Sequence, residues 1–140
     1  VKGDKHILKF NKSDYGDFIN ALWRVAYDGI TRNILTRLKN NEEVEIEGEY
    51  ASVIDTGIKV TKINMFSSNE KYFYTWDQAR EHMLIKHEDG KLRIEFDDVK
   101  SQGGNLFFTL GIIMNDNANI LEALLLYVKN NRIHRLSDLL

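Results

Sequence analysis

The sequence predicts an α+β protein with an N-terminal helix, a bent antiparallel sheet or partial barrel, and a C-terminal capping helix. Apolar residues recur first at three- and four-residue intervals, then alternate with polar residues, and finally return to the helical interval. The strands follow one another without intervening helices, which favours α+β over α/β architecture. We expect about six or seven strands, with the last helix covering apolar side chains at an open end of the sheet.

The N-terminal helical pattern covers residues 13–39. Ser13 or Asp14 can cap its start, and Lys39 followed by asparagines can end it. Gly29 interrupts the pattern at a cost of about 1 kcal/mol, but the apolar stripe keeps its phase, so we predict one long helix or two nearly coaxial ones. The stripe consists of Phe18, Ile19, Leu22, Trp23, Ala26, Ile30, Ile34 and Leu38.

Alternation with a period of two begins after residue 41. Val44 and Ile46 alternate with glutamates, and Gly48 and Tyr50 extend the same face, so the first strand has one solvated side. In the strand before the Gly103-Gly104 connection, Leu92, Ile94 and Phe96 are expected to face inward. Turn-forming residues separate the further strands, which we expect at 58–63, 72–76, 82–86, 91–96 and 106–114.

The C-terminal helix is predicted from a wide apolar stripe. Asn117 or Asn119 can cap its start, and Lys129 with the two asparagines that follow can end it. Residues 132–140 are expected either to add a helical turn or to be loose. The apolar positions of the helix are Ile120, Leu121, Leu124, Leu125 and Val128.

Composition limits the classes of function. The 140 residues match about one domain, and no linker or repeat divides them, so we predict a single domain over 1–140. A net charge of −2 argues against a nucleic-acid binder, because such proteins usually have a strongly basic face. The absence of cysteine excludes a disulfide framework and a thiolate nucleophile. No apolar stretch approaches the ~20 residues of a bilayer span, so we expect no transmembrane segment and a cytoplasmic location.

The order of elements over residues 44–131 resembles the bacterial pleckstrin-homology-like (PH-like) domain. In that family a strand that begins with glycine precedes an aromatic strand ending in Trp-Asp or Trp-Glu, and a glycine-turn hairpin then leads to a C-terminal helix. The resemblance implies a scaffold for protein contacts, oligomerisation or regulation. The matching segments are Thr56-Gly57-Ile58, Tyr72-Phe73-Tyr74-Thr75-Trp76-Asp77, Asp89-Gly90-Lys91-Leu92-Arg93-Ile94 and Asn117-Ala118-Asn119-Ile120-Leu121.

The chain also departs from the family pattern in two places. The helical segment 13–39 is not part of the basic PH-like fold. The short acidic turn at 55–57 lacks the basic cluster with which phosphoinositide-binding members hold lipid head groups. The resemblance therefore does not imply head-group binding.

The aromatic cluster at 72–76 supplies most of the candidate binding residues. Strand alternation places Tyr72, Tyr74 and Trp76 on one face and Phe73 on the other. Only one face can meet the core, so the other is exposed or is covered by the helix 13–39 or by a partner. Tyr and Trp are enriched in binding hot spots, although packing in the core is an alternative interpretation of these rings.

We therefore expect a non-catalytic interaction module with a protein partner or a homo-oligomeric state. The alternative is a carrier that holds a small apolar molecule or lipid between the sheet and its helices, with Trp23, Trp76 and Phe107 as walls. Together with Tyr72 and Tyr74, these residues are the candidate binding residues.

Histidines and carboxylates indicate neither a metal site nor an active site. His82 and His87 are five residues apart on a predicted strand and hairpin, which places them on opposite faces and matches no metal motif. We interpret them, and His6 and His134 near the termini, as surface residues. A nucleophile motif is also missing, so we expect no cofactor, no metal and no enzymatic activity.

The acidic residues allow one further interpretation. Asp97 and Asp98 are interpreted as the turn that ends a strand, where Asp is common. Glu81 with His82, or Asp77 beside Trp76, could form a small polar cluster, but solvated surface carboxylates are the preferred interpretation.

Overall fold

The computed structural model describes residues 28–47, 50–111 and 116–140. Residues 28–39 are helical, which confirms the described part of the predicted segment 13–39, whereas residues 13–27, with Trp23, lie outside the described residues. Ile34, Leu35 and Leu38 are buried in the hydrophobic cluster that also contains the sheets. The helix thus packs its apolar stripe onto the rest of the fold.

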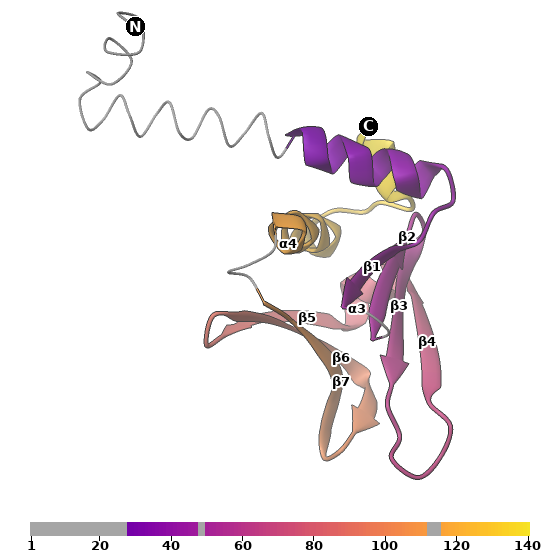
Figure 1. The fold of residues 1–140 in the computed structure, drawn as a ribbon, viewed down its shortest axis with the longest axis vertical. Helices are drawn as coiled ribbons and strands as arrows, with labels where there is room; N and C mark the ends of the chain where they lie inside the picture. Colours follow the sequence, from indigo (N-terminus) through magenta and orange to yellow (C-terminus); the bar gives the residue numbers. More distant parts are fainter. Residues whose placement is uncertain (1–27, 48–49, 112–115) are drawn as a thin grey trace, which may run out of the picture.

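The strands form two antiparallel sheets, which lie at an angle to each other (Figure 1). One sheet has four strands in the order β1-β2-β3-β4, and the other has three in the order β5-β6-β7. The sequence predicted one bent sheet or partial barrel, and this prediction is wrong because the strands form two separate sheets. The described strands close no barrel. The strands are β1 (Val44–Glu47), β2 (Ala51–Ile54), β3 (Gly57–Lys62), β4 (Glu70–Thr75), β5 (Met83–Glu88), β6 (Lys91–Ser101) and β7 (Gly104–Gly111).

A short helix, α3 (Trp76–His82), divides the two sheets in the sequence. The Thr75 hydroxyl accepts a hydrogen bond from the Gln78 backbone N–H, and the Gln78 side chain accepts one from the Thr75 N–H, which forms a capping box. The predicted strand 72–76 therefore ends at Thr75, and the strand predicted to begin at His82 begins at Met83. A helix at this point turns the chain out of the first sheet before the second begins.

The first predicted strand is also shorter than its alternation indicated. β1 ends at Glu47, and Tyr50 lies in a turn that leads into β2, a strand that the sequence analysis did not predict. Val44 pairs with Val53 across the two strands, and both side chains are buried. β1 and β2 bury the same face of the sheet. The apolar alternation therefore continues from one strand to the next, although the chain reverses direction between them.

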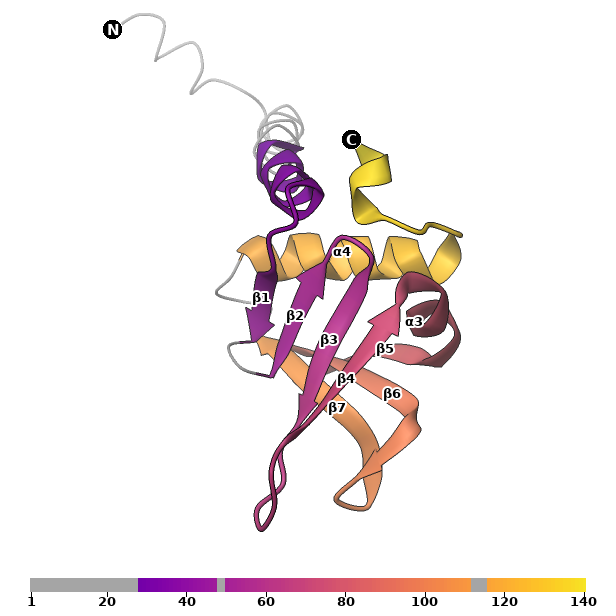
Figure 2. The same ribbon diagram turned by 90° about the vertical axis from the view of Figure 1, so that its right-hand side faces the viewer.

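The C-terminal helix α4 (Asp116–Asn130) lies across one end of the four-stranded sheet (Figure 2). This confirms the predicted helix and all five of its apolar positions, which are buried. Asn117 and Asn119, the alternative predicted caps, lie inside the helix. No described helix combines the length and the apolar character needed to cross a bilayer.

The chain then ends in a 3₁₀ turn, η1 (Leu136–Leu139), which is fixed to the β2–β3 turn. The carboxylate of Asp55 accepts hydrogen bonds from the backbone N–H and the hydroxyl of Ser137 at 2.8 and 2.7 Å. The Asp55 carbonyl accepts one from the Leu136 N–H at 2.9 Å. Residues 136–139 therefore form the helical turn that was one of the two expectations for the tail.

Candidate functional site

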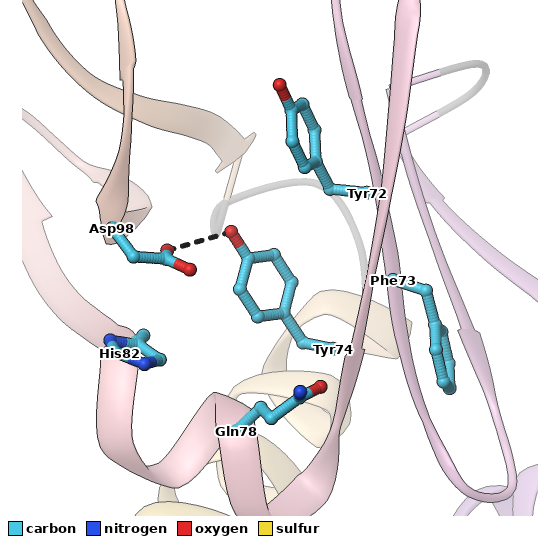
Figure 3. A pocket seen from close by; sticks show the side chains of 6 residues that line it. All are labelled: Tyr72, Phe73, Tyr74, Gln78, His82 and Asp98. Atoms are coloured by element: carbon cyan, nitrogen blue, oxygen red, sulfur yellow. Dashed lines mark hydrogen bonds between the residues drawn. The ribbon is translucent and has the colours of Figure 1, made fainter.

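A small polar pocket lies where β4, α3 and β6 meet (Figure 3). Tyr74 reaches across it, and its hydroxyl donates to Asp98 Oδ1 at 2.9 Å. The Tyr74 ring also stacks on Phe96, with 4.4 Å between the ring centroids. Burial and the Asp98 carboxylate raise the pKa of Tyr74, so the hydroxyl stays a hydrogen-bond donor. The pocket measures about 160 Å³ and is lined by Tyr72, Phe73, Tyr74, Gln78, His82 and Asp98.

Strand alternation correctly places the first aromatic residues of this region. Tyr72 and Tyr74 lie on the inner side of β4, and Phe73 points to the other side (Figure 3). Tyr72 donates to Glu70 Oε2 at 2.6 Å, and this bond raises the pKa of Tyr72. The structure thus brings two of the candidate binding residues together at the pocket.

Trp76 is placed differently from its prediction. It is the first residue of α3 rather than the last of a strand, and it is 1% exposed. Its indole N–H donates to the Asp55 carbonyl at 2.7 Å. In this position Trp76 packs in the core and does not share a surface with Tyr72 and Tyr74.

Beside the pocket, an irregularity in β6 brings two acidic residues toward His82. The β6–β7 ladder pairs Phe96 with Leu106 and resumes at Lys100, so residues 97–99 have no partner on β7. Asp97 Oδ1 lies 2.9 Å from His82 Nδ1. The ligand-type atoms of His82, Asp97 and Asp98 all lie within 4.8 Å of one another. The hydrogen bond with Asp97 raises the pKa of His82.

The sequence patterns did not predict this cluster. His82 ends a helix instead of beginning a strand, and β6 continues to Ser101 instead of ending at Phe96. One local signal was present, because two consecutive aspartates interrupt the alternation of Leu92, Ile94 and Phe96, as a bulge does. His87, in contrast, lies on β5 and contacts Glu122 of α4 at 2.6 Å.

The outer face of the three-stranded sheet carries Glu95 and Phe107. Burial alone would raise the pKa of Glu95, but hydrogen bonds from Arg93, Asn105 and Lys86 outweigh it, so the pKa is lowered. The Arg93 guanidinium also lies 3.7 Å from the centroid of the Phe107 ring. Phe107 is 44% exposed and contributes directly to an open surface.

A groove follows the outer face of the four-stranded sheet and measures about 590 Å³. Charged residues cross it, since Lys59 Nζ and Glu43 Oε1 form an ion pair at 3.1 Å. Hydrogen bonds from Ser52 and Lys59 lower the pKa of Glu43. Phe73 lines the same groove, so an ion pair and an aromatic residue lie on one face of the sheet.

The end of the molecule opposite α4 exposes apolar side chains that the sequence analysis did not single out. The β3–β4 loop, residues 63–69, carries Met65 and Phe66, which are 80% and 97% exposed. Asn64 holds the loop in shape, because its side chain donates to the Ser68 carbonyl at 3.0 Å and its backbone N–H donates to Asn69 Oδ1 at 3.1 Å. The exposed pair therefore stands on a loop with a defined conformation.

A shallow cavity adjoins this loop between the two sheets. It measures about 260 Å³ and is open to solvent. The carrier hypothesis predicted both Phe107 and Trp76 as walls of a ligand cavity. Phe107 lines this cavity, whereas Trp76 does not. The lining residues are Tyr50, Thr61, Lys62, Ile63, Ser101, Gln102, Leu106, Phe107, Phe108 and Thr109.

Comparisons of the chain with protein-family models, curated proteins and solved structures gave no match. The PH-like resemblance therefore stays a prediction.

Proposed function

We propose that the chain is a non-catalytic PH-like interaction module that contacts protein partners, including a second copy of itself, through the β3–β4 loop. The observation that carries this proposal is the exposure of Met65 and Phe66 at the loop tip. Burying a side chain of this size contributes about 1.5–3 kcal/mol. Phe and Met are also enriched in the buried centres of protein interfaces.

The shape of the loop supports the same proposal. The hydrogen bonds of Asn64 to Ser68 and Asn69 restrict the loop before any partner is bound. A restricted loop loses less conformational entropy on association than a flexible one. The loop therefore presents its two apolar side chains at a reduced entropic cost.

The arrangement of elements is consistent with a PH-like scaffold. A four-stranded and a three-stranded antiparallel sheet are followed by a helix across one end, which is the order that the resemblance implies. The pKa shifts of Glu43, Asp77 and Glu95 are all downward. A general acid needs the opposite shift, so these carboxyls favour a structural role.

The cavity beside the loop supports the alternative function, a carrier of a small apolar molecule. Its volume of about 260 Å³ is slightly below the range of about 300–1,000 Å³ that is typical of ligand pockets. It is also open rather than enclosed, which favours protein contact over carriage. Native mass spectrometry of the purified chain separates the two, because a carrier retains a bound small molecule.

Sedimentation velocity over a range of concentrations tests the proposed function. We expect the purified chain to associate, and the double variant Met65→Ser, Phe66→Ser to remain monomeric with an unchanged melting temperature. Leu126→Ser is the matched control, because Leu126 is a partly exposed apolar residue on α4 and lies away from the loop. Self-association through the loop is contradicted if the double variant and the wild type have the same concentration dependence.

A further inference from the structure

We propose that His82, Asp97 and Asp98 bind one divalent transition-metal ion. This site is separate from the β3–β4 loop and does not depend on the proposed interaction function. An imidazole nitrogen and carboxylate oxygens from these residues lie within 4.8 Å of one another. Ligand atoms on one ion at ~2.1 Å lie roughly 3–3.5 Å apart, so small side-chain rotations bring the three groups onto a common ion.

The backbone explains why these groups converge. Consecutive residues of a regular strand point to opposite faces, which would separate Asp97 from Asp98. The unpaired stretch 97–99 of β6 removes this restriction, because a bulge re-aims the side chains. The end of α3 then brings His82 to the same place, with 2.9 Å between His82 Nδ1 and Asp97 Oδ1. Two elements that β5 separates in the sequence thus supply a three-residue set.

The charge at this place also favours a cation. In the described part of the chain, Asp97 and Asp98 form no ion pair with a lysine or an arginine. Asp97 contacts His82, which is charged only when protonated, and Asp98 accepts a hydrogen bond from the Tyr74 hydroxyl. Glu95, on the same strand, is paired with both Arg93 and Lys86. A divalent ion would balance the charge of these two carboxylates.

A residue next to the proposed ligands also holds one of them in position. Tyr74 donates to Asp98 Oδ1 at 2.9 Å, and its ring is fixed by stacking on Phe96. Hydrogen bonds of this kind orient metal-ligating carboxylates in known sites. The adjoining pocket of about 160 Å³ leaves room for water molecules as the remaining ligands. Tyr74 is therefore a positioning residue of the proposed site.

The mixture of donors identifies the class of ion. Calcium prefers six to eight oxygen ligands, and magnesium is usually held by carboxylates and water. An imidazole with two carboxylates suits a first-row transition ion such as Zn²⁺ or Mn²⁺ better. We therefore expect Zn²⁺ and Mn²⁺ to bind, and Mg²⁺ at equal concentration to compete weakly.

Isothermal titration of the chelator-treated full chain with Zn²⁺ tests the proposal. We expect one high-affinity ion per chain, and roughly 100-fold or greater weakening in both His82→Ala and Asp98→Asn, because each removes a ligand. Tyr74→Phe keeps all three ligands and should weaken binding by about tenfold. His87→Ala is the matched control, because His87 contacts a single carboxylate, Glu122, and its removal should change nothing.

A second readout locates the ion directly. Substoichiometric Mn²⁺ should broaden the NMR signals of residues 82, 97 and 98 before those of residues 87 and 134. If His82→Ala does not fold, the Zn²⁺ affinity of Asp98→Asn and this broadening pattern still test the proposed site. The proposal is overturned by the absence of Zn²⁺ binding, by equal losses in His82→Ala and His87→Ala, or by broadening centred on another histidine. The variant Met65→Ser, Phe66→Ser should bind Zn²⁺ normally, which separates this test from that of the interaction function.

Discussion

Glu95 and Asp98 both lie on β6, but Glu95 is buried and Asp98 is exposed, and this difference in exposure gives them different roles. Glu95 is buried on the outer face of the sheet, and three donors hold it: Arg93 at 2.7 Å, and Lys86 and Asn105 at 3.2 Å. Asp98 accepts from the Tyr74 hydroxyl and is exposed. Glu95 is therefore expected to stabilise the fold, whereas Asp97 and Asp98 stay accessible to a ligand.

The variant Glu95→Gln should lower the free energy of unfolding at pH 7 by about 1–2 kcal/mol, because it weakens charge-assisted hydrogen bonds. The folded state lowers the pKa of Glu95 below 4.5. The stabilisation is therefore complete above that pH and is lost as the pH falls through the lowered value. Urea unfolding at pH 7 and pH 3 measures both effects. The exposed residue Glu88 supplies the control, Glu88→Gln, and an equal loss for Glu95→Gln at both pH values would contradict this account.

Gly57 lies where the surrounding atoms leave no room for a larger side chain. A Cβ there would overlap the Tyr74 carbonyl oxygen and come within 2.7 Å of the Phe73 ring. Gly57→Ala should therefore destabilise the protein by about 3 kcal/mol. Gly104→Ala is the control, because a Cβ at Gly104 meets nothing within 4 Å, and its effect should be about 0.5 kcal/mol or less. Thermal melts of the two variants give the comparison, and similar melting temperatures would be the contrary result.

Helix α3 separates the two sheets and positions the polar pocket. Thr75 and Gln78 start this helix through reciprocal hydrogen bonds, and His82 is its last residue. The helix also buries Trp76 and Ala79. Any loosening of α3 should therefore move His82 away from Asp97.

Thr75→Ala should destabilise the protein by about 1 kcal/mol, as loss of an N-cap generally does. Gln78→Ala removes the other half of the capping box. A double-mutant cycle by urea unfolding should show that the double variant costs less than the sum of the single variants, because both lose the same interaction. Strictly additive losses would show that the capping box is not a coupled unit.

Sequence patterns predicted the elements whose signal is local. The Asp89-Gly90 turn joins β5 to β6, and both residues have positive φ angles of 48° and 75°, as a two-residue hairpin requires. The inward faces of β6 and α4 were also predicted, because burial follows the strand and helix periods. α3 was missed because a run of aromatic residues favours a strand, although Thr75 and Gln78 have the spacing of a capping box.

The candidate sites were less predictable than the elements. Alternation placed Tyr72 and Tyr74 correctly, since one strand carries both. The approach of His82 to Asp97 depends on α3 and on the irregular stretch of β6, and neither the helix nor the bulge was predicted. Phe66 was not singled out because its exposure depends on how far the loop extends beyond the sheets, which an apolar residue among turn formers does not indicate.

At the scale of the whole molecule, Asp55 connects three distant parts of the chain. Its carboxylate holds Ser137, and its carbonyl accepts from the indole of Trp76 and from the backbone of Leu136. These contacts join the β2–β3 turn, α3 and the C-terminal turn η1 on the side of the sheets that α4 covers.

Asp55→Ala should leave the Ser137 N–H and hydroxyl without their acceptor and destabilise the protein by about 2 kcal/mol. Residues 136–140 should then be released first, because the Asp55 carboxylate accepts two of the hydrogen bonds that hold η1. Limited proteolysis followed by mass spectrometry detects this as early cleavage near the C-terminus. Asp138→Ala, an exposed neighbour in η1, is the control, and equal cleavage of both variants would contradict the proposed anchor.

If the β3–β4 loop is a contact surface, photo-crosslinking from its tip should capture the bound partner. A photoreactive phenylalanine analogue replaces Phe66 in one protein and Leu126 in a matched second one. We predict a discrete protein adduct from position 66, either the dimer in the purified chain or one defined product in a cell extract, and only background from position 126. Equal, diffuse labelling from both positions, together with a monomeric purified chain, would contradict the account.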